Sequence, residues 1–176
     1  MILESERLHL REPEPGDVEL LRAYYRRNAL RFAPWGESRN DDAAEHAAWI
    51  AARHAERRDG APVGFLCFER DGAALTAIVM LTGFSVAPSS AMISYTVDGS
   101  VEGSGVASEA VRAVLGHAFG TLDLASVSAH YDPENARSER LLQRLGFREV
   151  ARIPPLALPH LRQRGQVMTV LERSAR

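Results

Sequence analysis

A run of small residues lies between a predicted strand and a predicted helix, in the segment DGSVEGSGVASEAV from Asp98 to Val111. The backbone amides of residues 103–107 are open to a ligand at a helix N-terminus, where partial positive charge favours an anion such as pyrophosphate. Neither common nucleotide motif is met, because no Lys-Ser or Lys-Thr pair follows the second glycine and the third glycine of the dinucleotide fingerprint is absent. Such a turn is also ordinary helix-start chemistry, so context must decide.

A second readable segment, HYDPENARSERLLQRLGF, runs from His130 to Phe147. Residues 133–135 favour a helix start, leucines follow at helical spacing, and Gly146 suits the C-terminal cap. Taken alone, this segment is an ordinary surface helix with Asn135 as its N-cap.

Together the two segments resemble the GNAT superfamily of acetyl-CoA-dependent N-acetyltransferases, whose pattern is a GxGxA turn followed by an asparagine, a short helix and Gly-Phe. Within it, the chain is most similar to the ribosomal-protein N-terminal acetyltransferases of the RimJ/RimL type. The likeness rests on the stretches ERLHLREPEPGDVELL, ISYTVDGSVEGSGVASEAV and NARSERLLQRLGF. It implies a mixed α+β GNAT fold, with a mostly antiparallel sheet of about seven strands that contains a splayed parallel pair, flanked by about four helices.

Periodicity and turn residues predict the elements that position these segments. Strands are expected at 7–11, 62–70, 73–83, 91–97, 124–129, 147–153 and 165–172. Helices are expected at 15–28, 41–58, 105–119 and from Asn135, and a proline-rich segment, 154–159, joins the last two strands. No repeat or linker interrupts the pattern, so residues 1–176 are expected to form one domain.

The resemblance implies acetyl-CoA as cosubstrate. Its pyrophosphate would lie on residues 103–107, and its pantetheine arm between the predicted strands 93–97 and 124–129, with backbone amides of the first strand facing the thioester. Asn135 would hydrogen-bond the same arm. The implied cofactor-binding residues are Tyr95, Thr96, Val97, Gly103, Ser104, Gly105, Val106, Ala107, Asn135 and Ser138.

Three positions depart from related patterns. Ser100 replaces the Gln or Arg that commonly opens the phosphate motif, Met92 stands where some relatives carry a glutamate, and Leu142 stands where many N-terminal acetyltransferases place a tyrosine acid. Ser138, where RimL-type enzymes also carry a serine, would relay a proton to the departing thiolate. The alternative for Ser138 is a helix-surface serine without a catalytic role.

His130 is the candidate general base. It lies five residues before Asn135, where a related bacterial N-terminal acetyltransferase has a catalytic glutamate, and imidazole has a reference pKa of about 6.5. A lone histidine is also commonly structural, and Tyr131, Asp132 and Glu134 compete with it. Since an α-amine has a reference pKa of about 7.7–8.0, water can also serve.

Composition limits the other classes of function. The 176 residues are 45% hydrophobic with a net charge of −2, which suits one globular domain and gives no basic surplus for stable nucleic-acid binding. Cys67 is the only cysteine, so an internal disulfide and a cysteine zinc site are excluded, and the scattered histidines predict no metal. No apolar run approaches the roughly 20 residues of a membrane span, and no secretory signal is seen, so a cytoplasmic location is expected.

The expected activity is acetyl transfer to a primary amine, with a protein N-terminus beginning with alanine or serine as the leading acceptor. Small-molecule amines of antibiotics, toxins or metabolites are the enzymatic alternative, and a non-catalytic acyl-CoA sensor is the other. A monomer or homodimer is expected. The resemblance implies an acceptor groove formed by the first two helices. Five aromatic residues either line this groove or pack in the core, namely Tyr24, Tyr25, Phe32, Trp35 and Trp49.

Overall fold

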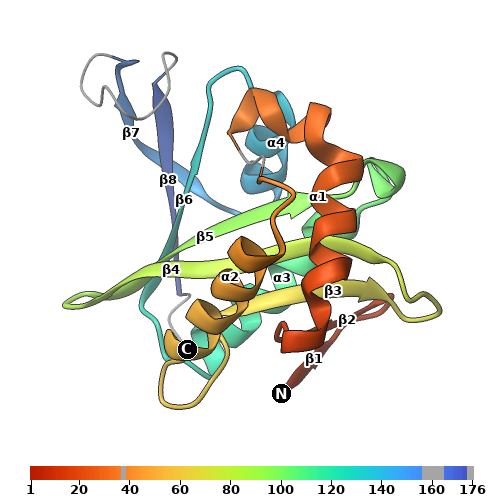
Figure 1. The fold of residues 1–176 in the computed structure, drawn as a ribbon. Helices are drawn as coiled ribbons and strands as arrows, with labels where there is room; N and C mark the ends of the chain where they lie inside the picture. Colours follow the sequence, from red (N-terminus) through yellow and green to blue (C-terminus); the bar gives the residue numbers. More distant parts are fainter. Residues whose placement is uncertain (37–38, 156–164, 174–176) are drawn as a thin grey trace. The chain divides into compact units, whose positions relative to one another are not determined.

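The computed structural model describes residues 1–36, 39–155 and 165–173 (Figure 1). The α-helices in these ranges are α1 (Val18–Phe32), α2 (Ala43–Ala55), α3 (Val106–Gly120) and α4 (Ala136–Arg144). The strands are β1 (Ile2–Glu4), β2 (Leu8–Arg11), β3 (Gly64–Glu69), β4 (Leu75–Val86), β5 (Ser89–Val97), β6 (Ser126–Tyr131), β7 (Arg148–Ile153) and β8 (Gln166–Glu172).

The strands hydrogen-bond in the order β1-β2-β3-β4-β5-β6-β8-β7. The sheet is mostly antiparallel, and β5 and β6 form a parallel pair. This confirms the mixed α+β fold. The sheet has one strand more than the seven predicted segments, because β1 has only three residues, too few for a readable alternation, and is defined by its pairing with β2.

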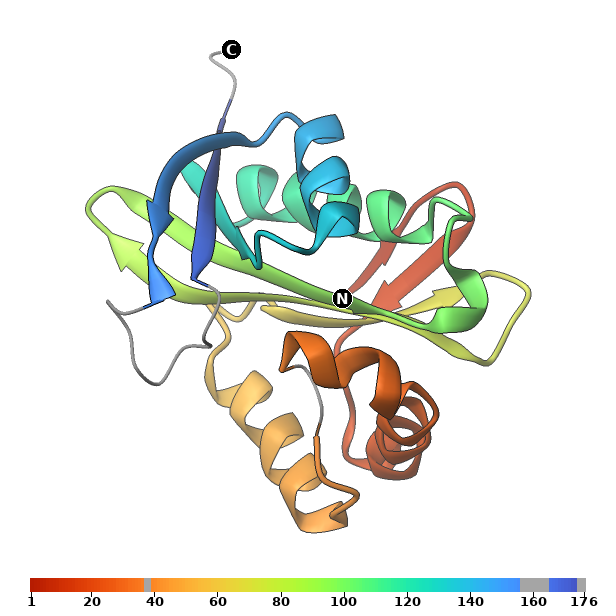
Figure 2. The same cartoon turned by 90° about the horizontal axis from the view of Figure 1, so that it is seen from above.

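The chain divides into two compact units, of which the first comprises Met1–Met80 and Tyr95–His117. In this unit, α1 and α2 cover one face of strands β2 to β4, and α3 lies on the other face (Figure 2). Tyr24, Tyr25, Phe32 and Trp49 are buried in one hydrophobic cluster with β3 and β4. The core-packing interpretation of these four aromatic residues is therefore confirmed.

The second unit comprises Leu81–Ser94 and Ala118–Arg176. Its last strand, β8, pairs antiparallel with both β6 and β7. The chain leaves α4 through Gly146, whose φ of 89° lies in the left-handed region, and the Phe147 N–H donates to the carbonyl of Leu142 at 3.0 Å. This is the predicted glycine cap.

Two element boundaries differ from the prediction in ways that matter for function. α1 continues to Phe32, four residues beyond the predicted end at residue 28. β6 runs to Tyr131, so His130 lies inside the strand and not after it. Residues 156–159 of the predicted proline-rich connection lie outside the described residues. None of the helices in the described ranges is long and apolar enough to cross a membrane.

Candidate active site

The glycine turn before α3 has the conformation that its residues predict. Gly103 and Gly105 have φ values of 78° and 89°, in the left-handed region that residues with a Cβ rarely adopt. Between them, the N–H and hydroxyl of Ser104 both donate to the carbonyl of Val101, at 3.3 and 2.6 Å. The two glycines thus let the chain turn sharply into α3.

Backbone amides of this turn are available to a ligand. In the part of the chain that the structure describes, the N–H groups of Gly103, Gly105 and Ala107 have no hydrogen-bond partner, and that of Val106 reaches Ser104 Oγ only at 3.5 Å. Both glycines are exposed, and a Cβ at Gly103 would meet nothing within 4 Å. Because free amides and the helix dipole both favour negative charge, the turn fits a phosphate group.

Two residues without a role in the sequence-based hypothesis hold the turn. Arg7, between β1 and β2, donates from Nη1 to the Ser104 carbonyl at 2.9 Å and from Nε to Glu109 Oε2 at 2.8 Å. The pKa of Glu109 lies below its ordinary value. Partial burial acts to raise this pKa, but the hydrogen bonds from Ser5 and Arg7 together have the larger effect. Arg7 and Glu109 are 102 positions apart in the sequence, so no local sequence pattern predicts that they pair.

Asp98 fixes the segment that leads into the turn. One carboxylate oxygen accepts from the N–H and hydroxyl of Ser100, at 2.9 and 2.6 Å, and the other accepts from Arg27 and Asn28 of α1. Burial opposes ionisation, but the hydrogen bonds prevail and lower the pKa of Asp98 to about 2. The Ser100 hydroxyl is therefore used within the protein.

The end of β5 is anchored to α1. Tyr95, Thr96 and Val97 are half-buried, and the Tyr24 hydroxyl donates to Thr96 Oγ1 at 3.0 Å. Burial raises the pKa of Tyr24 well above its ordinary value. The Thr96 hydroxyl accepts the bond from Tyr24 and keeps its own O–H as a donor.

In the second unit, the parallel strands part from each other. Their register covers Ser90 to Met92 opposite Ser126 to Ser128 and ends there. Both strands go on, β5 through Ser94 in this unit and β6 through Tyr131. The predicted splay is therefore present, and the backbone groups beyond it do not pair with each other.

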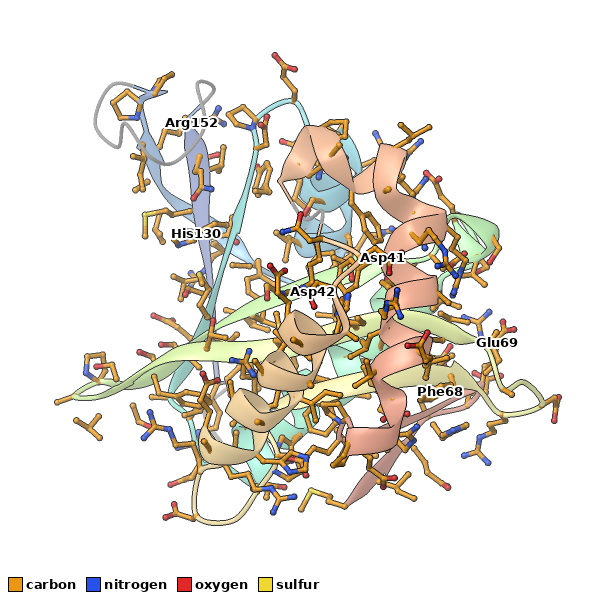
Figure 3. All side chains as sticks on the ribbon, viewed as in Figure 1. Asp41, Asp42, Phe68, Glu69, His130 and Arg152 are labelled. Carbon is orange, nitrogen blue, oxygen red and sulfur yellow. The ribbon has the colours of Figure 1, made fainter. Side chains whose placement is uncertain are left out.

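His130 and Tyr131 point to opposite faces of β6, because side chains alternate along a strand. His130, labelled in Figure 3, is half-buried. By strand alternation it shares its face with Ser126 and Ser128. Tyr131 is buried on the other face, where burial and the carboxylates of Glu139 on α4 and Glu149 on β7 raise the pKa of its phenol. His130 therefore lies on the face of β6 opposite α4.

The start of α4 carries two further predicted residues. Asn135 is the N-cap, and its Oδ1 accepts from the Ser138 N–H at 3.1 Å. The Asn135 amide group has no partner among the described residues, so it remains able to donate. Ser138 is half-buried in the first turn of the helix.

Asp132 is a candidate proton acceptor next to this helix. Its Oδ1 accepts from the Glu134 N–H at 2.9 Å. Its Oδ2 is buried and has no hydrogen-bond partner among the described residues. Buried polar atoms are rarely left in this state, so Asp132 competes with His130 for the role of base.

Leu142 and Met92 are the two other positions at which the sequence analysis noted a departure from related patterns. Leu142 is 1% exposed and belongs to the core, so no acid stands at that position. Met92 is half-buried on β5. No group of three or more His, Cys, Asp or Glu side chains within the described ranges could hold a metal ion.

Comparisons with known proteins give the chain its relatives. A family model described as an acetyltransferase (GNAT) domain matches residues 7–148, whereas no curated protein matches. Among solved structures, the ribosomal-protein-S5-alanine acetyltransferase from Vibrio fischeri is 18% identical, with 98% of this chain and 96% of that chain covered and a TM-score of 0.83.

Two further structures were solved with coenzyme A or its acetyl form. RimL, a ribosomal L7/L12 α-N-protein acetyltransferase in complex with coenzyme A, is 16% identical over 98% of both chains, with a TM-score of 0.83. The microcin C7 self-immunity acetyltransferase MccE, in complex with acetyl-CoA and AMP, is 14% identical over 96% of this chain and 94% of that chain, with a TM-score of 0.81. At such identities the likeness establishes the fold.

Proposed function

The chain belongs to the acetyltransferase (GNAT) family, and we propose that it transfers the acetyl group of acetyl-CoA to the N-terminal α-amine of a protein. The observation that carries the acetyl-CoA part of this proposal is the glycine turn, where amides without a partner among the described residues suit an anion at the start of α3. In this proposal, the pyrophosphate of acetyl-CoA binds residues 103–107, and the acyl end of the molecule meets the backbone of residues 95–97.

Asn135 and Ser138 are proposed to complete cofactor binding. The free amide group of Asn135 is a suitable donor to a carbonyl of the pantetheine arm. Ser138, one turn into α4, is proposed to lie beside the sulfur. The crystallised relatives that hold coenzyme A and acetyl-CoA support the choice of ligand.

Transfer joins the amine nitrogen to the acetyl carbon and breaks the bond between that carbon and sulfur. The nitrogen must lose a proton and the thiolate must gain one. We assign acceptance of the first proton to His130 or, through its buried oxygen, Asp132, with water as a relay. Ser138 is proposed to relay the second proton, giving its hydroxyl proton to the thiolate and regaining one from water. Because His130 lies on the face of β6 opposite α4, the two proton transfers can occur on different sides of the strand.

The reference pKa values of the two kinds of protein amine favour an α-amine as acceptor. With reference pKa values of about 7.7–8.0 for an α-amine and about 10.4 for lysine, about a third of α-amines but only about a thousandth of lysines are neutral at pH 7.5. A site with Met92 where some relatives carry a glutamate base suits an acceptor that needs little activation. Relatives named as acetyltransferases of ribosomal proteins support the same choice.

Small-molecule amines are the second candidate, since the fold is shared with a microcin self-immunity acetyltransferase. A sensor that binds acyl-CoA without turnover is the third. We also propose that residues 1–176 form one domain without a stable nucleic-acid partner, as a monomer or homodimer. Strands β4 and β5, which each run through both units, support the single domain.

The test is incubation of the purified protein with acetyl-CoA and a panel of peptides and small amines, with thiol release followed by absorbance and products identified by mass. The proposal expects acetylated peptides, most rapidly those that begin with alanine or serine. If only small amines are acetylated, the acceptor is a small-molecule amine and not a protein N-terminus. Binding of acetyl-CoA without any product would favour the sensor.

A further inference from the structure

Arg7 joins the glycine turn to the first turn of α3 through one guanidinium group. Its Nη1 donates to the Ser104 carbonyl at 2.9 Å, and its Nε and Nη2 lie 2.8 and 2.7 Å from Glu109 Oε2. The planar fork of arginine is suited to holding two acceptors at once. The side chain therefore bridges the turn and the helix that follows it.

Glu109 holds the guanidinium in one orientation. Its second oxygen, Oε1, accepts from the Arg7 N–H at 2.7 Å and from Ser5 Oγ at 2.6 Å. The Glu109 side chain is only 14% exposed, so the carboxylate receives donors on both oxygens in a partly buried place. Arg7 is thus fixed at its backbone and at its side chain.

The bond to Ser104 has a direct consequence for the amides of the turn. In a trans peptide, the carbonyl and the next N–H point in opposite directions. A Ser104 carbonyl held toward Arg7 therefore directs the Gly105 N–H away from Arg7. That N–H has no partner among the described residues, so the bond presents a donor for an anion.

Gly105 also allows the guanidinium to approach closely. A Cβ at this position would lie 3.2 Å from Arg7 Nη2, closer than most carbon contacts. At Gly103, a Cβ would meet nothing within 4 Å. Of the two glycines, only Gly105 must lack a Cβ to leave room for the guanidinium, in addition to having a left-handed backbone.

We propose that Arg7, held by Glu109, is a positioning residue that orients the Ser104–Gly105 peptide so that the turn binds the phosphate groups of the cofactor. This inference rests on the proposed use of acetyl-CoA. Arg7 acts through the backbone, so it differs from a residue that binds the cofactor directly. Its loss should weaken cofactor binding and leave the chemical step unchanged.

The test compares Arg7→Lys with Arg70→Lys. Lysine keeps the charge but cannot hold Glu109 and the Ser104 carbonyl as a fork. Arg70 is a matched control, because its side chain is 47% exposed against 48% for Arg7, and it donates to the Ser5 carbonyl and pairs with Glu4. Neither of these side-chain contacts involves the turn, and the bond from the Arg70 N–H to the Arg7 carbonyl uses the backbone, which Arg70→Lys leaves in place.

For Arg7→Lys we expect two constants to rise about tenfold: the Kd for coenzyme A, measured by calorimetry, and the KM for acetyl-CoA. A tenfold rise corresponds to the loss of one charge-assisted hydrogen bond. The kcat at saturating acetyl-CoA should remain within about twofold, since the chemical groups are untouched. The Gly105 amide signal in an NMR spectrum of the free protein should move in Arg7→Lys and stay in place in Arg70→Lys.

Wild-type coenzyme A affinity in Arg7→Lys would overturn this inference alone. Equal losses in Arg7→Lys and Arg70→Lys would also overturn it, since a general loss of stability would then explain both. If the wild-type protein does not bind coenzyme A, the proposed function fails and this role fails with it.

Discussion

Asn135 Oδ1 accepts a 3.1 Å hydrogen bond from the backbone N–H of Ser138. The asparagine therefore caps α4 with its oxygen, and its amide group has no partner among the described residues. The sequence left helix cap and cofactor contact as alternatives for Asn135, and this geometry makes them compatible. The two roles can be separated by substitution, because they use different atoms of one side chain.

Asn135→Asp should separate them. Aspartate is as good an N-cap as asparagine, so the melting temperature should stay close to wild type, while the lost donor should raise the KM for acetyl-CoA about tenfold. Asn135→Ala should lose the same affinity and also about 1 kcal/mol of stability. Thermal unfolding and steady-state kinetics on both variants test this. A wild-type KM in Asn135→Asp would remove Asn135 from the cofactor site.

Alanine at the two turn glycines should have unequal effects. Gly103→Ala and Gly105→Ala each place a Cβ at positive φ, which costs about 1 kcal/mol or more. In Gly105→Ala the new Cβ would also lie 3.2 Å from Arg7 Nη2, so the guanidinium must shift slightly and coenzyme A binding should weaken further. Gly116→Ala is the control, since it lies inside α3 with nothing within 4 Å and should gain roughly 0.5–1 kcal/mol. Calorimetric titration and chemical denaturation measure these differences, and equal coenzyme A affinities in the two turn variants would contradict the account.

Substitution of the candidate proton-transfer groups should slow the reaction. Ser138→Ala should lower kcat by about a hundredfold if the hydroxyl protonates the thiolate, with the KM for acetyl-CoA little changed. His130→Ala should lower the rate and remove the histidine limb from the pH profile of kcat/KM. If the pH profile of His130→Ala keeps the wild-type shape, His130 is not the base. Asp132→Asn is then measured under the same conditions to test Asp132.

Asp98 predicts acid sensitivity. Its pKa in the folded protein is about 2, below the reference value of about 3.9 for an unfolded chain. The stabilisation is therefore present at pH values above about 4 and is lost as the pH falls through 2, and the difference between the two pKa values corresponds to about 2.6 kcal/mol. Asp98→Asn should be less stable than wild type at pH 7 and should lose less stability between pH 4 and pH 2. Urea unfolding across this range tests the prediction, and parallel pH curves for the two proteins would contradict it.

Local signals in the sequence were sufficient for most of the fold. Strand alternation, the glycine turn and the Gly146 cap all depend on neighbouring residues, and the structure places these features where they were expected. β1 was missed because three residues hold no period. The place of β8 between β6 and β7 follows from pairing over long distances, which one sequence does not display.

The supports of the candidate site were harder to predict than its ligand-facing residues. Gly103 and Gly105 are recognisable because their conformation demands glycine. Arg7, Glu109 and Asp98 act through contacts with distant parts of the chain, and nothing in their local sequence distinguishes them from exposed charges. The orphan oxygen of Asp132 is visible only once burial is known.

The most direct test of the central claim uses one peptide that begins with alanine and contains an internal lysine, together with the same peptide blocked at its α-amine. Each is incubated with acetyl-CoA and the protein near pH 7.5, and tandem mass spectrometry locates the acetyl group. The account predicts one acetyl group on the α-nitrogen for each thiol released, and no product from the blocked peptide. Acetylation of the lysine at a similar rate in both peptides would contradict it.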